Sequence, residues 1–129
     1  MRHLVLSTAL LLASFGAAEA QDAAAGEKAF AVCKACHQIG PNAKNAVGPE
    51  LNGVVGRKAG SVESYNYSPA NKNSGLTWDE ATLREYLMDP RKKVPGTKMI
   101  FAGIKDEKRL NDLIAYLKQF DASGNKATQ

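Results

Sequence analysis

The stretch VCKACHQIG, residues 32–40, holds both cysteines of the chain and its only histidine beyond the first three residues. Cys33, Cys36 and His37 follow the order C-x-x-C-H, which is the pattern of covalent haem attachment. Residues three and four apart share one face of a helix, so two thiols can meet two vinyl groups of one porphyrin while the imidazole binds its iron. The pattern predicts one haem c, attached through Cys33 and Cys36, with His37 as an iron ligand.

Three other uses of these residues fit the sequence less well. A zinc site needs about four ligands, and no second cysteine or histidine pair follows. A thioredoxin-like dithiol lies in a βαβ unit, and no strand pattern flanks the motif. A disulfide between Cys33 and Cys36 would close a very short loop, which stabilises little, and would leave His37 unexplained.

Residues 1–20 have the form of a cleaved export signal. Arg2 gives a positive start, Leu4–Phe15 is an apolar run, and Ala18 and Ala20 supply small residues before Gln21. The run is too short to span a bilayer. We therefore expect a mature domain of residues 21–129 in the periplasm, with residues 123–129 as a flexible polar tail.

The charge of the chain is mildly basic. Removing residues 1–20 takes away one basic and one acidic residue, so the net charge of +4 is unchanged. The basic residues are spread along the chain, which argues against a nucleic-acid-binding protein and suits brief contact with acidic proteins.

Four helical signals predict an all-α domain. Asp22 is expected to cap a helix that runs to about Lys34, and Ser68 with Pro69 to open a short turn through Asn73. Thr77 and Glu80 have capping-box spacing before a helix that Pro90 stops. Asp106 is expected to cap a last helix, in which Leu110, Leu113, Ile114 and Leu117 share a face.

Two long segments, residues 38–67 and 91–104, show no helical or strand periodicity. A compact domain seldom tolerates a loop of some thirty residues unless it is functional. The first segment carries apolar side chains that need a partner: Val47, Leu51, Val54, Val55 and Tyr67. A large bound apolar cofactor would receive them and enlarge an otherwise thin core.

The haem iron needs a sixth ligand, and no second histidine remains beyond residue 20. Met88 falls at a helix end, where packing is the better interpretation. Met99 follows the proline-stiffened loop VPGTK, residues 94–98. We therefore predict Met99 as the second iron ligand, a His/Met pair that raises the reduction potential. An open sixth position for peroxide or a gas is the alternative.

The chain resembles the class I cytochromes c, and bacterial cytochrome c2 and its mitochondrial counterpart most closely. The resemblance covers nearly all of residues 21–129. The motifs that carry it are CKACH (33–37), VGPELNGVVGRKAG (47–60), YNYSPANKNSGLTW (65–78), EYLMDPRKKVPGTKMIFAGIKDE (85–107) and DLIAYLK (112–118). It implies the cytochrome c fold, with helices and long loops wrapped around one covalently attached haem.

The resemblance also implies roles for individual residues. A carbonyl at Pro49 would accept the hydrogen bond from His37. The haem propionates would be bound by Arg57, Tyr67 and Trp78, with Asn71 near the inner one. Tyr86 and Thr97 would lie near the Met99 sulfur. On the terminal helices, Gly26 and Phe30 would cross Leu113 and Tyr116.

The function implied by the resemblance is single-electron transfer, not enzymatic catalysis. A monomeric carrier would take electrons from a cytochrome bc1 complex and deliver them to a terminal oxidase or a photosynthetic reaction centre. Val32 and Ala46 stand where mitochondrial members tend to have docking lysines. The docking residues that remain are Arg91, Lys92, Lys98 and Lys105, with Lys44 as a further candidate. The alternative is a haem enzyme or sensor whose sixth ligand is displaced.

Overall fold

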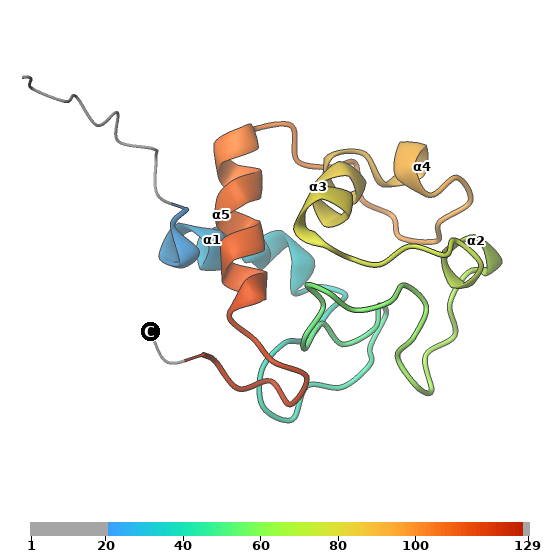
Figure 1. The fold of residues 1–129 in the computed structure, drawn as a ribbon, viewed down its shortest axis with the longest axis horizontal. Helices are drawn as coiled ribbons and strands as arrows, with labels where there is room; N and C mark the ends of the chain where they lie inside the picture. Colours follow the sequence, from blue (N-terminus) through green and yellow to red (C-terminus); the bar gives the residue numbers. More distant parts are fainter. Residues whose placement is uncertain (1–20, 128–129) are drawn as a thin grey trace, which may run out of the picture.

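The structure is a computed structural model that describes residues 21–127 (Figure 1). The expected export signal, residues 1–20, lies outside the described residues. Five α-helices and one 3-10 helix occur in residues 21–127, and these residues form no strand, only two isolated β-bridges. The all-α prediction is confirmed.

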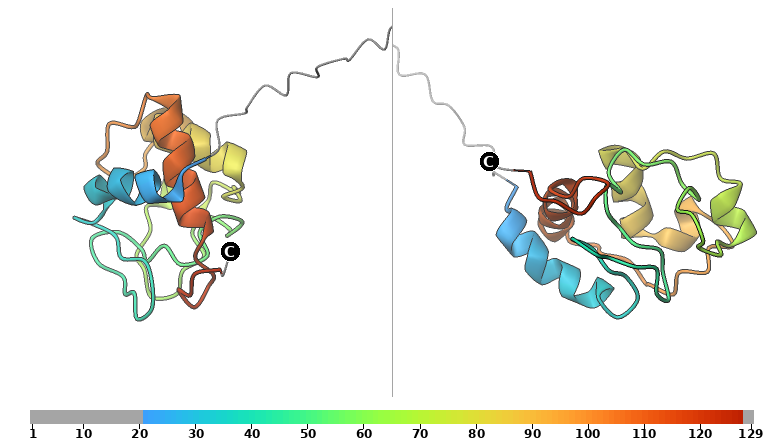
Figure 2. Two further views of the ribbon diagram at one scale, coloured as in Figure 1. Left: turned by 90° about the vertical axis from the view of Figure 1, so that its left-hand side faces the viewer. Right: turned by 90° about the horizontal axis from the view of Figure 1, so that it is seen from below.

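The two terminal helices cross and pack against each other. Helix α1 (Ala23–Ala29) begins at Asp22, whose side chain accepts hydrogen bonds from two backbone N–H groups. Helix α5 (Glu107–Lys118) begins at Asp106, which accepts from the N–H of Arg109. The two helices make the most extensive contact between elements in the described chain, and Figure 2 shows the crossing.

The crossing is close because Gly26 has no side chain. A Cβ at Gly26 would lie 1.9 Å from the carbonyl oxygen of Asp112 and 2.8 Å from Cβ of Tyr116. The ring of Phe30 packs on Tyr116 with centroids 5.3 Å apart, and Leu113 is 1% exposed. This confirms the helix crossing that the sequence motifs implied.

The first helix is shorter than predicted. It ends at Ala29 and continues as the 3-10 helix η1 (Phe30–Cys33) instead of an α-helix to Lys34. The N–H groups of Cys36 and His37 both donate to the carbonyl of Cys33, at 3.1 and 2.9 Å. Because of this tight turn, the side chain of His37 points into the interior of the molecule.

Helix α3 (Glu80–Met88) begins two residues later than the capping box predicted. Asp79 is the N-cap, accepting from the N–H of Thr82. Thr77 is held elsewhere, in an antiparallel bridge to Lys58, while the N–H of Trp78 donates to the carbonyl of Arg57 at 2.8 Å. These pairings keep residues 77 and 78 extended, so Thr77 does not cap the helix.

Two short helices flank α3. The turn after Ser68 is α2 (Pro69–Lys72), as predicted, and Ser68 accepts from the N–H of Asn71. Pro90 ends α3 but also opens α4 (Pro90–Lys93), for which Asp89 is the N-cap. The prediction of an irregular segment from residue 91 was therefore wrong for its first three residues, because the aspartate–proline pair suits a helix start as well as a stop.

Residues 119–127 make specific backbone contacts that the sequence pattern did not predict. The N–H of Ala127 donates to the carbonyl of Gln119 at 2.8 Å, and Phe120 pairs with Lys126 in an isolated bridge. The prediction of a structureless polar tail is wrong for residues 123–127, because Asp121 caps a turn there. In residues 21–127 no helix is long and apolar enough to cross a membrane.

A cavity framed by the helices and loops

A cavity of about 480 Å³ is lined by residues of η1, α3, α5 and the long loops. Ligand pockets commonly measure about 300–1,000 Å³, so this one has room for a large ligand. All eleven side chains predicted to bind the cofactor line it: Cys33, Cys36, His37, Pro49, Arg57, Tyr67, Asn71, Trp78, Tyr86, Thr97 and Met99. The fold thus joins residues that are up to 66 positions apart.

His37 enters the cavity with a fixed orientation. Its Nδ1 lies 2.7 Å from the carbonyl oxygen of Pro49. A carbonyl only accepts, so Nδ1 carries the proton and donates it, which leaves a lone pair on Nε2. Burial lowers the pKa of His37, outweighing the opposite effect of the Pro49 hydrogen bond. The neutral imidazole with a bare Nε2 is the form that ligates a metal.

Gly48 provides the space behind the imidazole. A Cβ at this position would lie 2.3 Å from Cε1 of His37 and 2.7 Å from its Nδ1. Such distances are far below carbon van der Waals contact. The ring therefore stands against bare backbone on one side and faces the cavity.

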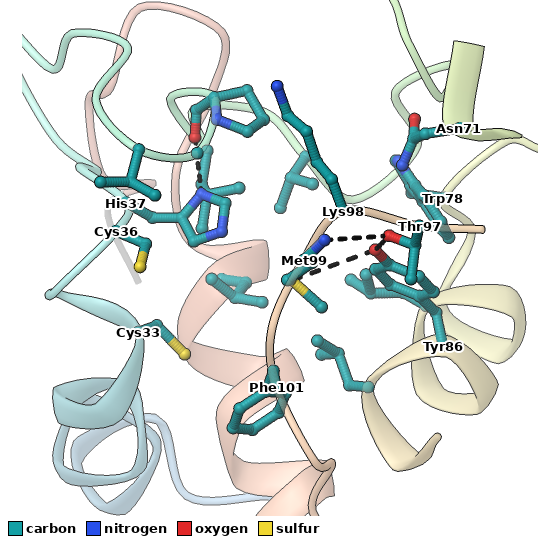
Figure 3. Close-up of a pocket in the computed structure, with 18 of the residues that line it drawn as sticks. Cys33, Cys36, His37, Asn71, Trp78, Tyr86, Thr97, Lys98, Met99 and Phe101 are labelled. Atoms are coloured by element: carbon teal, nitrogen blue, oxygen red, sulfur yellow. Dashed lines mark hydrogen bonds between the residues drawn. The ribbon is translucent and has the colours of Figure 1, made fainter. Parts of the chain in front are cut away.

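The two cysteines lie on the same wall as His37 (Figure 3). Neither cysteine forms a disulfide. Burial raises the pKa of the Cys33 thiol to about 11, against a smaller opposing effect of the Arg109 charge. A thiol that keeps its proton at neutral pH is not a poised catalytic nucleophile. In residues 21–127 no group of three or more His, Cys, Asp and Glu side chains is arranged to hold a metal ion.

Met99 lies in the wall formed by the loop after α4. Its Sδ is 4.0 Å from the hydroxyl of Tyr86, and that hydroxyl is 2.9 Å from Oγ1 of Thr97. The N–H of Met99 also donates to Oγ1 of Thr97 at 3.3 Å. Figure 3 shows this group opposite His37. Met88 does not line the cavity and packs against the core instead.

Polar side chains also line the cavity. Nη1 of Arg57 donates to the carbonyl of Asn52 at 3.0 Å and lies 3.5 Å from a carboxylate oxygen of Glu50. The hydroxyl of Tyr67 accepts from the N–H of Val62, and burial raises the pKa of Tyr67. The Oδ1 of Asn71 is buried without a hydrogen-bond partner. A buried unpaired oxygen is costly, which indicates a donor group that a bound ligand or ordered water supplies.

The apolar side chains of the loop 38–67 were predicted to contact a bound cofactor, and four of the five line the cavity or its rim. Leu51, Val54 and Tyr67 line the cavity. Val55 packs against the core without lining the cavity, and Val47 reaches its rim but is 73% exposed.

Sequence reasoning missed several lining residues. Tyr65 and Phe101 both face the cavity. Tyr65 alternates with Tyr67, and Phe101 with Met99, so a period of two within each loop was the available signal.

The residues present fit a covalently bound haem. Two thiols, a metal-ready imidazole and a thioether border one largely apolar space, and the Arg57 guanidinium and the Tyr67 hydroxyl supply hydrogen-bond donors in its wall. Cys33, Cys36 and His37 come from a single turn, which matches the spacing of the attachment motif.

Comparison with known proteins agrees with this geometry. The family model described as cytochrome c matches residues 23–121. A cytochrome c2 of Blastochloris viridis is 60% identical over 126 residues, which cover 98% of this chain and 99% of the relative.

Solved structures give the same result. Cytochrome cH from Methylobacterium extorquens is 62% identical, with a TM-score of 0.71 over 75% of this chain and 97% of that one. Cytochrome c2 from Rhodospirillum centenum is 42% identical, with a TM-score of 0.72 over 78% of this chain and 98% of that one. The chain therefore belongs to the cytochrome c family and is an electron-transfer protein with one haem c bound through Cys33 and Cys36.

Proposed function

We propose that this protein is a periplasmic carrier that takes single electrons from a cytochrome bc1 complex and delivers them to a terminal oxidase or a photosynthetic reaction centre. The observation that carries the proposal is the placement of His37 and Met99 in opposite walls of one cavity. With both as iron ligands, neither coordination position is open to a substrate. The arrangement favours a carrier over the alternative, an enzyme or sensor with a displaceable ligand.

The bound haem supplies an iron that alternates between the ferrous and ferric states. The chain's own residues keep its surroundings constant. The carbonyl of Pro49 fixes the imidazole of His37, and Thr97 and Tyr86 hold the loop of Met99 by hydrogen bonds. The largely apolar walls exclude water, which favours the less charged ferrous centre and raises the potential.

We propose that the polar residues of the cavity wall bind the haem propionates. Arg57 supplies positive charge there, partly offset by Glu50. Burial lowers the pKa of Arg57, opposed by the Glu50 charge. The hydroxyl of Tyr67 and the amide of Asn71 add hydrogen-bonding capacity. Trp78 lines the same cavity, with its ring centroid 4.7 Å from that of Tyr86.

The rim of the cavity is the proposed docking face. Three apolar residues at the rim are exposed: Val32 by 52%, Val47 by 73% and Ile100 by 91%. Exposed apolar residues that cluster together mark interaction sites. The proposed basic docking residues are Arg91, Lys92, Lys98, Lys105 and Lys44, all of them exposed.

Two of these lysines have hydrogen bonds of their own. Lys98 donates to the carbonyl of Asn66 and lies over the ring of Tyr65, 4.6 Å from its centroid. Lys105 donates to the carbonyl of Met88 at 2.5 Å. Their charges are therefore held in place at the surface.

Stopped-flow kinetics test the proposed route. Purified ferric protein is mixed with membranes that contain a cytochrome bc1 complex and are supplied with reduced quinone, at increasing salt concentration. We expect reduction to be fast at low salt and slower as salt rises, because screening weakens attraction between exposed charges. No reduction would refute the donor, and reduction without salt dependence would refute docking by the basic residues.

Export is tested separately by fractionation. We expect the haem-containing protein in the periplasmic fraction, with Gln21 as its first residue. A haem protein that retains residues 1–20 would contradict the cleaved signal.

A further inference from the structure

The C-terminal turn, residues 119–127, packs beside the loop that follows the haem-attachment motif (Figure 1). The match to the cytochrome c family model ends at residue 121. Residues 122–127 therefore lie beyond the family model, and the structure gives them specific contacts. The turn is closed by hydrogen bonds from the N–H of Ala127 to the carbonyl of Gln119 and from the N–H of Asp121 to that of Asn125, at 2.8 and 3.0 Å.

Asp121 shapes the turn so that Gly124 faces inward. The Oδ1 of Asp121 accepts from the N–H groups of Ser123 and Asn125, at 2.8 and 3.0 Å. Gly124 is buried at φ +82°, and a Cβ there would lie 2.2 Å from the carbonyl oxygen of Gly40. No other residue fits at position 124 without a shift of the backbone.

The site against which Gly124 packs includes the buried side chain of Asn52. The Oδ1 of Asn52 accepts from the N–H of Gly40 at 2.8 Å, and its Nδ2 donates to the carbonyl of the same residue at 3.0 Å. Asn52 is 7% exposed. A Cβ at Gly124 would lie 2.7 Å from this Nδ2, and one at Gly53 would lie 3.1 Å from Ala122. The C-terminal turn thus covers the Asn52–Gly40 pair.

That pair ties together the base of the loop that holds His37. Asn52 and Gly40 are twelve residues apart and close the loop. Next to them, the N–H of Leu51 donates to the carbonyl of Gln38 at 3.0 Å. Pro49, three residues before Asn52, presents the carbonyl that accepts from Nδ1 of His37. Hydrogen bonds and the short chain segment from Pro49 to Asn52 therefore connect the C-terminal turn to the imidazole.

We propose that the C-terminal turn positions His37 and so lowers the reduction potential of the bound haem. By holding the loop base, it keeps the carbonyl of Pro49 at hydrogen-bonding distance from Nδ1. A hydrogen bond at Nδ1 makes the imidazole a stronger donor, which stabilises ferric iron. Asp121, Gly124 and Asn52 are positioning residues in this scheme, which rests on the proposed ligation by His37.

The test compares two glycines with similar backbone conformations in the full-length haem protein. Gly124→Ala places a methyl group against Gly40. Gly75→Ala is the control, because Gly75 has φ +70° and nothing lies within 4 Å of its Cβ position. We expect Gly124→Ala to raise the reduction potential and to speed amide hydrogen exchange at Gly40 and Leu51 several-fold, with Gly75→Ala leaving both unchanged.

A second pair of variants adds no bulk and covers the case in which Gly124→Ala fails to fold. Asp121→Ala removes the acceptor of two N–H groups, whereas Asp121→Asn keeps an oxygen in its place. We expect the Ala variant to raise the potential and the Asn variant to retain the original value.

A potential equal to that of the matched control, with faster exchange in the loop, would overturn the positioning role. Unchanged exchange in both Gly124→Ala and Asp121→Ala would overturn it as well, because the turn would then not hold the loop. An unaltered protein that lacks the low-spin spectrum of six-coordinate iron would instead refute the proposed ligation by His37 and Met99.

Discussion

Replacing Gly48 with alanine tests how tightly the imidazole of His37 is held. The new Cβ would lie 2.3 Å from Cε1 of the ring and 2.7 Å from its Nδ1. Because carbon atoms are at optimal separation at about 3.5–4.0 Å, the ring has to retreat by about 1 Å. The bond from Nδ1 to Pro49, now 2.7 Å, would then exceed hydrogen-bonding distance.

The expected cost has two parts. Overpacking destabilises by about 1–3 kcal/mol, and loss of the buried hydrogen bond adds about 1 kcal/mol. For a domain of this size each kcal/mol lowers Tm by about 4–8 °C, so we expect Tm to fall by roughly 10 °C or more. Circular dichroism during heating of the haem-loaded protein measures this change.

The control for this experiment is Gly56→Ala. Gly56 has φ +92° and nothing within 4 Å of its Cβ position, so alanine there adds backbone strain without a clash. Left-handed backbone costs a non-glycine residue about 1–2 kcal/mol. If Tm falls no further in Gly48→Ala than in Gly56→Ala, the contact with His37 does not constrain the ring and the reasoning is refuted.

Three further predictions concern single side chains. In Asp112→Asn, the free energy of unfolding should fall less than in the unaltered protein when the pH is lowered below about 4, the ordinary pKa of a carboxyl group. Urea unfolding at a series of pH values measures this difference. The N–H of Asp22 helps hold the pKa of Asp112 below its ordinary value, so the contribution of the carboxylate is present above that value and is lost as pH falls through the lowered pKa. Tyr86→Phe removes a hydroxyl 4.0 Å from the Met99 sulfur and should lower the reduction potential by up to about 40 mV, since a net hydrogen bond contributes about 1 kcal/mol; an equal or higher potential in a redox titration would contradict this. Met99→Ala should lower the potential while haem stays attached, and Met88→Ala should leave it unchanged; the reverse pattern would show that the wrong methionine was chosen.

The fold was predictable where local chemistry decides it. Asp22, Ser68 and Asp106 each cap the helix start expected of them, because an N-cap depends on the side chain and the next three residues. Thr77 has the same local chemistry and does not cap. The strand-like pairing of residues 77 and 78 with residues 57 and 58 overrides it, and the sequence near Thr77 does not reveal that pairing.

The haem-binding residues of the cavity were predictable from the sequence, but the segment that packs behind them was not. Cys33, Cys36 and His37 are recognisable because their spacing is set by one rigid cofactor. The C-terminal turn was missed because its packing site depends on Gly40 and Asn52, more than seventy residues away, and because Gly124 gives no hydrophobic signal. Long-range contacts between backbone groups leave little trace in hydrophobic periodicity.

The central claim is that iron in this protein is held by His37 and Met99 and carries single electrons. The absorption spectrum of the purified ferric protein at neutral pH tests it most directly, through the charge-transfer band that arises only when a thioether sulfur binds the iron. We expect the band to be present in the unaltered protein and to disappear in Met99→Ala. Absence of the band from the unaltered protein would rule out Met99 as a ligand and with it a simple electron carrier, because an iron without the sulfur ligand leaves a position open to other chemistry.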